Sequence, residues 1–500
     1  MSRTKLLPIS LSAIALSVAA PAFADVTAVE LWAEWQTQSA TMGQVLSATE
    51  VVERDGGLTL SGFTTTFSDG EVSTVGRIDE IVMTDNADGT VSITMSDTYA
   101  LTISFIETRG APPANVGVDL LSENLLITVG GVAGARSYDY SASSITVVDG
   151  PLTGGSGPPP IIDMEITLSD LVASYLLNGS DPDNMSYTST SSFSGARGIL
   201  DVTPPPNEDG HLKFSFSVGA VEGGGSGTLG NFLMVSENPD LVPAGFDLNG
   251  QFTYDRVSYE VTLEHPRDPF AMFYSNDGGA ISATFSETEL DYALSAAGAQ
   301  ARVIVPDLPF PIEAQVGSAE ASFRIPLAPG DAPQDVSARL AYQDVTFSAQ
   351  LWNMMDPMQA FPRDPITVIA DLTGAVQVTA NILAMDPENM AAPPGELREL
   401  SLNELRISVG GAELSGTGDM TFAPGQAVPM PVGAVDLRLA GGNALLDRLQ
   451  QSGLVPIEQL AMARGMLGAF ARPGATPDTL ESTIQFSEGG GISANGVPLR

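Results

Sequence analysis

The chain of 500 residues contains no cysteine. This absence excludes a disulfide framework, a thiolate-bound zinc ion and a cysteine nucleophile. Histidine is almost as scarce, because His211 and His265 are the only two, and neither has a second histidine at metal-ligand spacing. The Gly-x-Ser-x-Gly motif of a serine-nucleophile elbow is also missing. We therefore expect no metal, no cofactor and no enzymatic activity, with a pair of carboxylates as the remaining catalytic alternative.

Basic residues are few as well. The sequence has 21 Lys and Arg against 60 Asp and Glu, which gives a formal net charge of −39. Because only 16% of the residues are charged, the imbalance reflects missing basic residues and not acidic runs. A charge of this size repels nucleic acid and anionic lipid headgroups. We therefore expect no nucleic-acid partner, and any lipid would have to bind through its tails.

The N-terminus has the pattern of a secretory signal. Arg3 and Lys5 precede an apolar stretch at residues 6–20, and residues 22–24 read Ala-Phe-Ala. This order predicts a signal peptide over residues 1–24 that is cleaved after Ala24. The apolar stretch is too short for a confident membrane span, so we expect a periplasmic protein with no stable membrane span after cleavage.

The dominant hydrophobic period is two, which is typical of half-buried antiparallel strands. Clear alternation of apolar and polar residues occurs at 91–95, 101–105, 212–218, 290–294 and 437–439. Turn-forming pairs such as Asn-Gly and Asp-Gly separate these segments. The sequence therefore predicts a mainly β fold: one or more extended, curved antiparallel sheets built from repeated strand–turn–strand units.

A helix is predicted directly after the signal. Thr27 and Glu30 form a capping box, and the helix would carry Trp32 and Trp35 and end near Met42. The two tryptophans would either pin the helix onto the sheet, which is the interpretation we favour, or dock on a membrane or partner.

A helical hairpin is predicted at residues 443–471, near the other end of the chain. Asn443 would cap its first helix and Gly453 would end it. Pro456 would open the second helix, and Pro473 follows its end.

Glycine- and proline-rich stretches divide the chain. Residues 151–160, 203–210 and 222–230 have the composition of loops or flexible linkers. We expect an N-terminal β-rich region at residues 25–240 and a C-terminal β-rich region at residues 241–500.

The C-terminal region contains an internal repeat. Residues 252–259, Phe-Thr-Tyr-Asp-Arg-Val-Ser-Tyr, match residues 340–347, Leu-Ala-Tyr-Gln-Asp-Val-Thr-Phe, in the order of apolar and polar positions. The matching units extend over residues 252–285 and 340–380. Repeated units bury their faces on their neighbours, so the repeat predicts strand pairs that stack along one extended sheet.

The tetrapeptide Pro-Arg-Asp-Pro occurs once in each unit, at residues 266–269 and 362–365. Proline restricts the backbone on both sides of it, and Asp can bond to the local backbone. A rigid turn is therefore the favoured interpretation, and an ion site is the alternative.

Part of the sequence resembles known proteins. The segments that carry the resemblance are 342–346, Leu351-Trp352, Asp356-Pro357, 361–365 and the ending 491–499. Over about residues 240–500 they resemble an uncharacterised family of exported alphaproteobacterial proteins, which has no established activity and so implies no catalytic residue. The strand and glycine cadence at residues 414–422 resembles AsmA-like envelope proteins, which are extended β structures associated with lipid movement between membranes.

A curved sheet with one apolar face needs a cover, and an uncovered part would form a groove. The adaptable methionines of the repeat insertion and of the helical hairpin are the candidate groove residues, together with two of their apolar neighbours: Trp352, Met354, Met355, Met358, Met462, Met466 and Leu467. Ordinary core filling is the alternative. We hypothesise a non-enzymatic envelope protein that binds a lipid or another hydrophobic ligand in this groove. The alternative is a structural component, or a partner of another envelope protein, without a small ligand.

Overall fold

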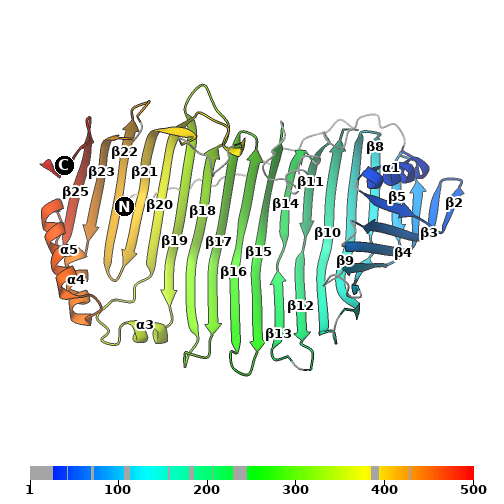
Figure 1. The fold of residues 1–500 in the computed structure, drawn as a ribbon, viewed down its shortest axis with the longest axis horizontal. Coiled ribbons are helices and arrows are strands. Elements are labelled where there is room, and N and C mark those ends of the chain that lie inside the picture. Colours follow the sequence, from blue (N-terminus) through cyan, green and yellow to red (C-terminus); the bar gives the residue numbers. More distant parts are fainter. Residues whose placement is uncertain are drawn as a thin grey trace, which may run out of the picture.

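The computed structural model describes residues 26–41, 43–68, 72–105, 113–155, 158–179, 185–206, 208–228, 245–384, 393–426 and 429–499. The predicted signal peptide at residues 1–24 and Met42 lie outside the described residues. The strands of the described residues form one 27-stranded antiparallel sheet, which Figure 1 shows from its N-terminal end (blue) to its C-terminal end (red). The predicted fold class, mainly β with an extended antiparallel sheet and helices at both ends, is confirmed.

The N-terminal end of the sheet packs around helix α1 (Ala28–Thr41). Its strands are β1 (Gln44–Ser47), β2 (Glu50–Arg54), β3 (Gly57–Ser68), β4 (Val72–Asp85), β5 (Val91–Met95), β6 (Thr98–Phe105), β7 (Ala114–Glu123), β8 (Leu126–Val132) and β9 (Ala135–Gly154). Two routes connect β4 to β9, one through β5 and β8 and the other through β6 and β7. This end contains the hydrophobic core cluster of the described residues.

Helix α1 begins at the predicted capping box. The Thr27 amide donates to the Glu30 carboxylate (3.2 Å), and the Glu30 amide donates to the Thr27 hydroxyl (3.3 Å). Trp32 is buried and packs edge-on against Phe63 of β3, with ring centroids 6.0 Å apart. The interpretation that Trp32 pins the helix onto the sheet is therefore confirmed.

The middle of the sheet repeats the branching of the N-terminal end. Its strands are β10 (Ile161–Asn178), β11 (Ser186–Phe193), β12 (Gly195–Thr203), β13 (His211–Val218) and β14 (Val221–Thr228). One half of β10 pairs with β11, which continues to β14, and the other half pairs with β12, which continues to β13. Both routes reach β15.

The prediction of a flexible linker at residues 222–230 is wrong for residues 222–228, because they belong to strand β14. Gly223, Gly224 and Gly225 pair with β11 on one side and with β15 on the other. A Cβ atom on Gly223 would lie 2.3 Å from the ring of Phe252 on β15. The glycines therefore leave room for a side chain of the neighbouring strand, and their composition does not indicate flexibility here.

The C-terminal half is a regular array of long strands. They are β15 (Asp247–Glu264), β16 (Phe270–Ser286), β17 (Glu289–Ile304), β18 (Ile312–Pro326), β19 (Gln334–Phe347), β20 (Ile366–Val378), β21 (Gly395–Val409), β22 (Ala412–Phe422), β23 (Pro431–Ala440), β24 (Arg472–Pro473), β25 (Thr479–Ser487), β26 (Gly491–Ala494) and β27 (Val497–Pro498). Each strand from β15 to β23 pairs with the next along the chain, and β25 then pairs with β23. Both predicted repeat units lie in this array, as the hairpins β15–β16 and β19–β20.

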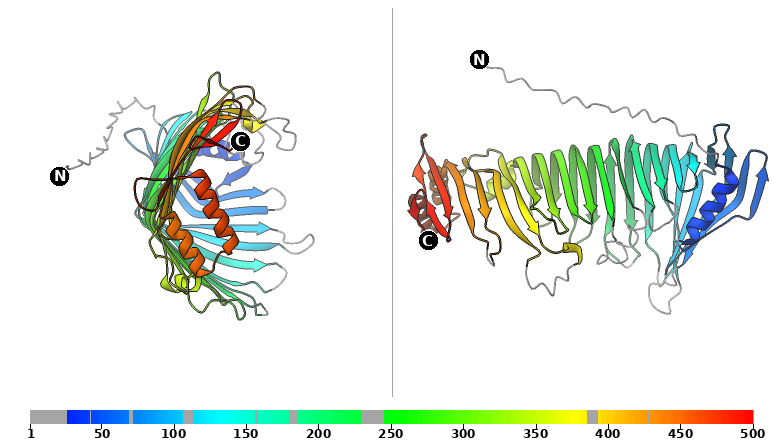
Figure 2. Two further views of the ribbon diagram at one scale, coloured as in Figure 1. Left: turned by 90° about the vertical axis from the view of Figure 1, so that its left-hand side faces the viewer. Right: turned by 90° about the horizontal axis from the view of Figure 1, so that it is seen from above.

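A crease interrupts the pairing at one level of β15 to β19. The regular pairing stops at Asp255 on β15 and Gly278 on β16, and it resumes at Val257 and Asn276. The interruption continues on β17 at Gly298, which has a φ of 61°, and on β19 at Asp344, which has a φ of 56°. The register of β19 against β20 also shifts here. Such irregularities bend strands, and the sheet is C-shaped when viewed along its long axis (Figure 2).

Helices occupy the rim and the C-terminal end of the sheet. They are α3 (Ala349–Met355), η2 (Ile382–Ala384), α4 (Gly442–Ser452) and α5 (Ile457–Phe470). Helices α4 and α5 form the predicted hairpin and lie on the concave side of the C-shaped section (Figure 2). Gly453 ends α4 in a left-handed conformation, as predicted.

The predicted capping role of Asn443 is wrong. Gly441 occupies the N-cap position of α4 and makes no side-chain bond there. Instead the carboxylate of Asp478 accepts bonds from the amides of Asn443 and Ala444, both at 3.1 Å. A residue 35 positions away in sequence satisfies the free amides of this helix, which no local pattern could show.

The packed N-terminal core generates a stability prediction. Leu31 is fully buried, so Leu31→Ala should lower the free energy of unfolding by about 2–5 kcal/mol. Val29→Ala, on the exposed side of the same helix, is the control and should change it by less than about 0.5 kcal/mol. Urea denaturation followed by tryptophan fluorescence measures both. Equal effects of the two substitutions would contradict the described packing of α1.

Candidate functional site

The concave face of the C-terminal half is apolar because alternate residues of every strand point to it in register. One row of directly paired residues crosses the sheet from β15 to β23: Phe252, Ile281, Leu294, Ala321, Leu340, Ala370, Leu405, Gly416 and Leu437. The next row on this face is Tyr254, Gly279, Ala296, Ala319, Tyr342, Val368, Ile407, Leu414, Leu439 and, on β25, Leu480. Neither row contains a charged residue.

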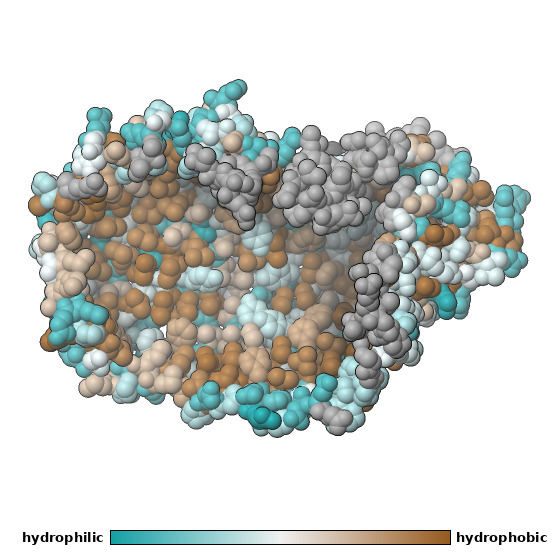
Figure 3. All heavy atoms as spheres, in the orientation of Figure 1, coloured by the Kyte–Doolittle hydropathy of each residue, from teal (hydrophilic) through white to brown (hydrophobic). Residues whose placement is uncertain are grey.

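This concave apolar face of strands β14 to β25 is called the trough below. Figure 3 shows it from the front, with hydrophobic side chains spread over the floor and polar side chains along the lower rim. Seven of its large side chains, all on β15 to β19, have an exposed fraction between 37% and 44%: Phe252, Ile281, Leu294, Phe323, Ile325, Leu340 and Tyr342. Contiguous apolar surface of this kind is uncommon on soluble proteins unless it binds something.

The convex face of the same strands is polar. Its ion pairs include Arg256 with Asp277 (2.8 Å), Arg324 with Glu289 (2.8 Å), Arg339 with Asp371 (2.7 Å) and Arg406 with Glu413 (3.0 Å). Exposed pairs of this type contribute little stability each. The strand register places these charged side chains on the convex face and so keeps them off the concave face. A shift of the register by one residue would place them in the trough.

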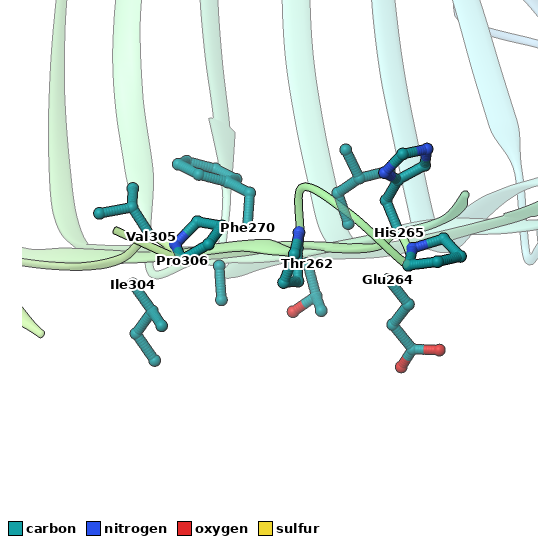
Figure 4. Close-up of a pocket in the computed structure, with 11 residues that line it drawn as sticks. Thr262, Glu264, His265, Phe270, Ile304, Val305 and Pro306 are labelled. Atoms are coloured by element: carbon teal, nitrogen blue, oxygen red, sulfur yellow. The ribbon is translucent and has the colours of Figure 1, made fainter. Parts of the chain in front are cut away.

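The lower rim shows both faces at once. In Figure 4, Phe270 and Val305 lie on one side of the strands, and Thr262 and Glu264 lie on the other. Phe270 pairs with Leu263, and both belong to the apolar face. They line a recess of about 510 Å³ that also includes His265.

The two histidines take part in local contacts. The Nδ1 atom of His265 accepts bonds from the amides of Arg267 (3.3 Å) and Asp268 (3.1 Å) in the turn before β16. His211 contacts Asp201 and Glu264 on the convex face. Within the described ranges, no group of three or more His, Cys, Asp or Glu side chains is placed to hold a metal ion.

The N-terminal end of the trough merges with the packed core. Tyr138 and Tyr140 of β9 lie there, and Tyr140 makes an edge contact with Tyr175 of β10, with ring centroids 5.8 Å apart. Beside them, Arg136 is buried and forms an ion pair with Glu34 of α1 (2.7 Å). A packed core thus lies at the N-terminal end of the sheet, beyond the strands of the trough.

The C-terminal end of the trough is covered differently. Met466, Leu467 and Phe470 of α5 face the floor residues Leu437 and Leu439 across a cavity of about 500 Å³. The main-chain oxygen of Phe470 accepts bonds from Ser482 (2.6 Å) and Asn495 (3.0 Å), which hold the end of the helix. Helix α5 thus lies over the trough floor without filling the space beneath it.

The structure separates the predicted groove residues into two places. Met466 and Leu467 line the cavity beneath α5, whereas Met462 is 67% exposed. The others lie in and after helix α3, at the rim: Trp352 makes an edge contact with Phe347 (6.4 Å), and Met354, Met355 and Met358 are exposed.

The trough floor itself was not among the predicted site residues. The alternation at residues 290–294 and 437–439 identified strands, and it placed Leu294 and Leu437 on an apolar face. Alternation does not show whether another layer covers that face. The sequence feature that indicates an uncovered face is the scarcity of helical segments that could form such a layer.

The comparisons with known proteins concern the same half of the chain. The model of a family described as an uncharacterized protein conserved in bacteria (DUF2125) matches residues 247–499. The chain belongs to this family. The matched range begins at β15 and ends after β27, so it contains most of the trough. A search of curated proteins found no match, and a search of solved structures found none either.

Tyr140 generates a prediction about pH. Burial, with smaller contributions from Tyr138 and Tyr175, raises its pKa from 10.0 to about 12. The folded state therefore favours the neutral phenol, and the stability this provides is present below pH 10 and is lost as the pH rises to about 12. Tyr140→Phe should lose less stability over this range, as measured by denaturation at a series of pH values.

A tyrosine absorbance titration provides the control. In the folded protein, Tyr140→Phe should remove a component that ionises near pH 12. In denaturant the two proteins should differ only by one tyrosine that ionises near the usual value. Loss of a component near pH 10 from the folded protein would contradict the described burial of Tyr140.

Proposed function

We propose that this protein is a non-enzymatic component of the bacterial cell envelope that binds the acyl chains of lipids in the trough. The observation that carries the proposal is the apolar floor, on which seven large side chains of β15 to β19 remain more than a third exposed. Covering such a surface with hydrocarbon contributes roughly 25 cal/mol per Å² of apolar area removed from water. The acyl chains of a lipid are a ligand of matching chemistry.

The dimensions of the trough favour chains over compact ligands. Its rows cross from β15 to β25, which at about 4.8 Å between neighbouring strands is a length of about 43 Å. The acyl region of one lipid leaflet is about 15 Å thick, half of a bilayer core of about 30 Å. The floor could therefore hold several acyl chains in series, and a chain could move along it without meeting a charged side chain.

The charge of the protein supports binding through tails. A net charge of −39 repels anionic headgroups, so attraction must come from the apolar floor. A periplasmic location follows from the predicted signal at residues 1–24. The resemblances to exported alphaproteobacterial proteins and to AsmA-like envelope proteins, which are associated with lipid movement, also support this proposal. Among the described residues, none of the helices has both the length and the apolar character needed to cross a membrane.

Two adjacent residues of β18 offer a matched test. Phe323 belongs to the trough floor, and Ser322 points to the convex face opposite Arg339. Phe323→Glu and Ser322→Glu add the same charge, but only the first places it on the floor, where an acyl chain would bury it. Phe323→Glu should weaken binding of the neutral lipid monopalmitin at least about tenfold, and Ser322→Glu should change it less than about twofold.

Binding would be measured by displacement of a fluorescent apolar probe, and lipid co-purified with the native protein would be identified by mass spectrometry. Equal effects of the two substitutions would contradict binding on the floor. A folded wild-type protein that carries no lipid and does not bind monopalmitin would contradict the proposed function and favour a structural or protein-interaction role.

A further inference from the structure

One buried polar side chain stands on the otherwise apolar floor. Asn276 of β16 is 4% exposed and lies at the crease. Its Nδ2 atom donates to the phenol oxygens of Tyr254 (3.4 Å) and Tyr274 (3.2 Å), and its Oδ1 atom accepts a bond from the Gly278 amide (3.2 Å). One amide group therefore holds two phenols, which come from the neighbouring strands β15 and β16.

Both tyrosine rings lie along the floor. A Cβ atom on Gly279 would come within 2.5 Å of the Tyr254 hydroxyl oxygen, so the Tyr254 ring lies over this glycine. The Tyr274 ring stacks on Tyr259, with centroids 5.1 Å apart and planes 26° from parallel. Both hydroxyl groups are thus fixed close to the same amide nitrogen, and both tyrosines are only partly buried.

Each phenol still has a proton to donate. A phenol hydroxyl is both a donor and an acceptor, and Asn276 uses only the acceptor side of Tyr254 and Tyr274. In the described part of the chain, neither hydroxyl donates to a protein acceptor. The pair therefore presents two adjacent hydrogen-bond donors on a floor whose two central rows carry no charged side chain.

We propose that the hydroxyl groups of Tyr254 and Tyr274 bind the carbonyl oxygen of a neutral acyl ester whose chain lies in the trough. This inference rests on the proposed function and adds the class of ligand. A carbonyl oxygen has two lone pairs and can accept both bonds. A free carboxylate is a poorer ligand, because the protein carries a net charge of −39 and Asp255 and Asp277 lie at the same crease.

The repeat supplies a matched control. Tyr342 of β19 occupies the position that corresponds to Tyr254 and also lies on the floor. Its partners across the strands are Ala319 and Val368. Among the described residues, no amide side chain donates a hydrogen bond to the Tyr342 hydroxyl, in contrast to the bond from Asn276 to Tyr254. Removal of its hydroxyl group tests the loss of a phenol from the trough without the loss of the donor pair.

The experiment compares monopalmitin with its ether analogue, 1-O-hexadecylglycerol, which has the same chain length and headgroup but no carbonyl. The full-length protein should bind the ester about tenfold more tightly, since two neutral hydrogen bonds are involved. The double variant Tyr254→Phe/Tyr274→Phe should lose this preference and keep its affinity for the ether. Tyr342→Phe should retain the preference.

The outcomes separate the two proposals. Equal binding of ester and ether by the wild-type protein would overturn the proposed role of Tyr254 and Tyr274, and so would an ester preference that persists in the double variant. Either result would still support lipid binding in the trough. If the wild-type protein binds neither compound, the proposed function itself fails.

An infrared measurement distinguishes the loss of the two hydrogen bonds from misfolding of the double variant. The carbonyl band of ¹³C-labelled monopalmitin should shift to lower frequency when the ester binds the wild-type protein and Tyr342→Phe, and it should not shift with the double variant. A shift of equal size with all three proteins would overturn the assignment of Tyr254 and Tyr274.

Discussion

In-register antiparallel pairing is the constraint on which this structure depends. Because side chains alternate along a strand, aligned strands keep every second residue on one face, and the apolar rows continue from β15 to β25. The crease could have broken this order. Instead, neighbouring strands are interrupted at the same level, so that Tyr254 above the crease and Tyr259 and Tyr274 below it share the apolar face. The sheet bends there without exchanging its two faces.

The two ends of the trough differ in how they are made. Beyond its N-terminal end, α1 and strands β3 to β9 build a packed core with buried side chains and the Arg136–Glu34 pair. At the C-terminal end, only α5 lies over the floor, above a cavity. Between the ends each strand contacts mainly its neighbours, so backbone pairing holds this part together, as in other linear arrays. A packed core is thus found at one end only, and the exposed floor side chains lie between the ends, on β15 to β19.

The two units of the internal repeat occupy equivalent places in the sheet. Residues 252–259 and 340–347 both cross the crease, and each places a tyrosine on the floor just before an interruption of the pairing. The Pro-Arg-Asp-Pro elements both precede a strand that returns from the lower rim, β16 and β20. Similar sequences therefore occur where the sheet must bend and turn. The linker prediction is wrong for residues 222–228 because composition does not distinguish a flexible linker from glycines that accommodate a neighbour's ring, as Gly223 does for Phe252.

The sequence by itself determined the β class, the alternation that separates apolar from polar faces, the capping box of α1 and the helical hairpin near residues 443–471, because these depend on neighbouring residues. Only the tertiary structure decided that the apolar face is uncovered, that Asp478 caps α4, and that Met466 and Leu467 meet the floor while Met354 and Met355 lie at the rim. It also brought Asn276 between Tyr254 and Tyr274. Such contacts join residues that are distant in sequence, and their geometry follows from strand register and sheet curvature, which no local pattern encodes.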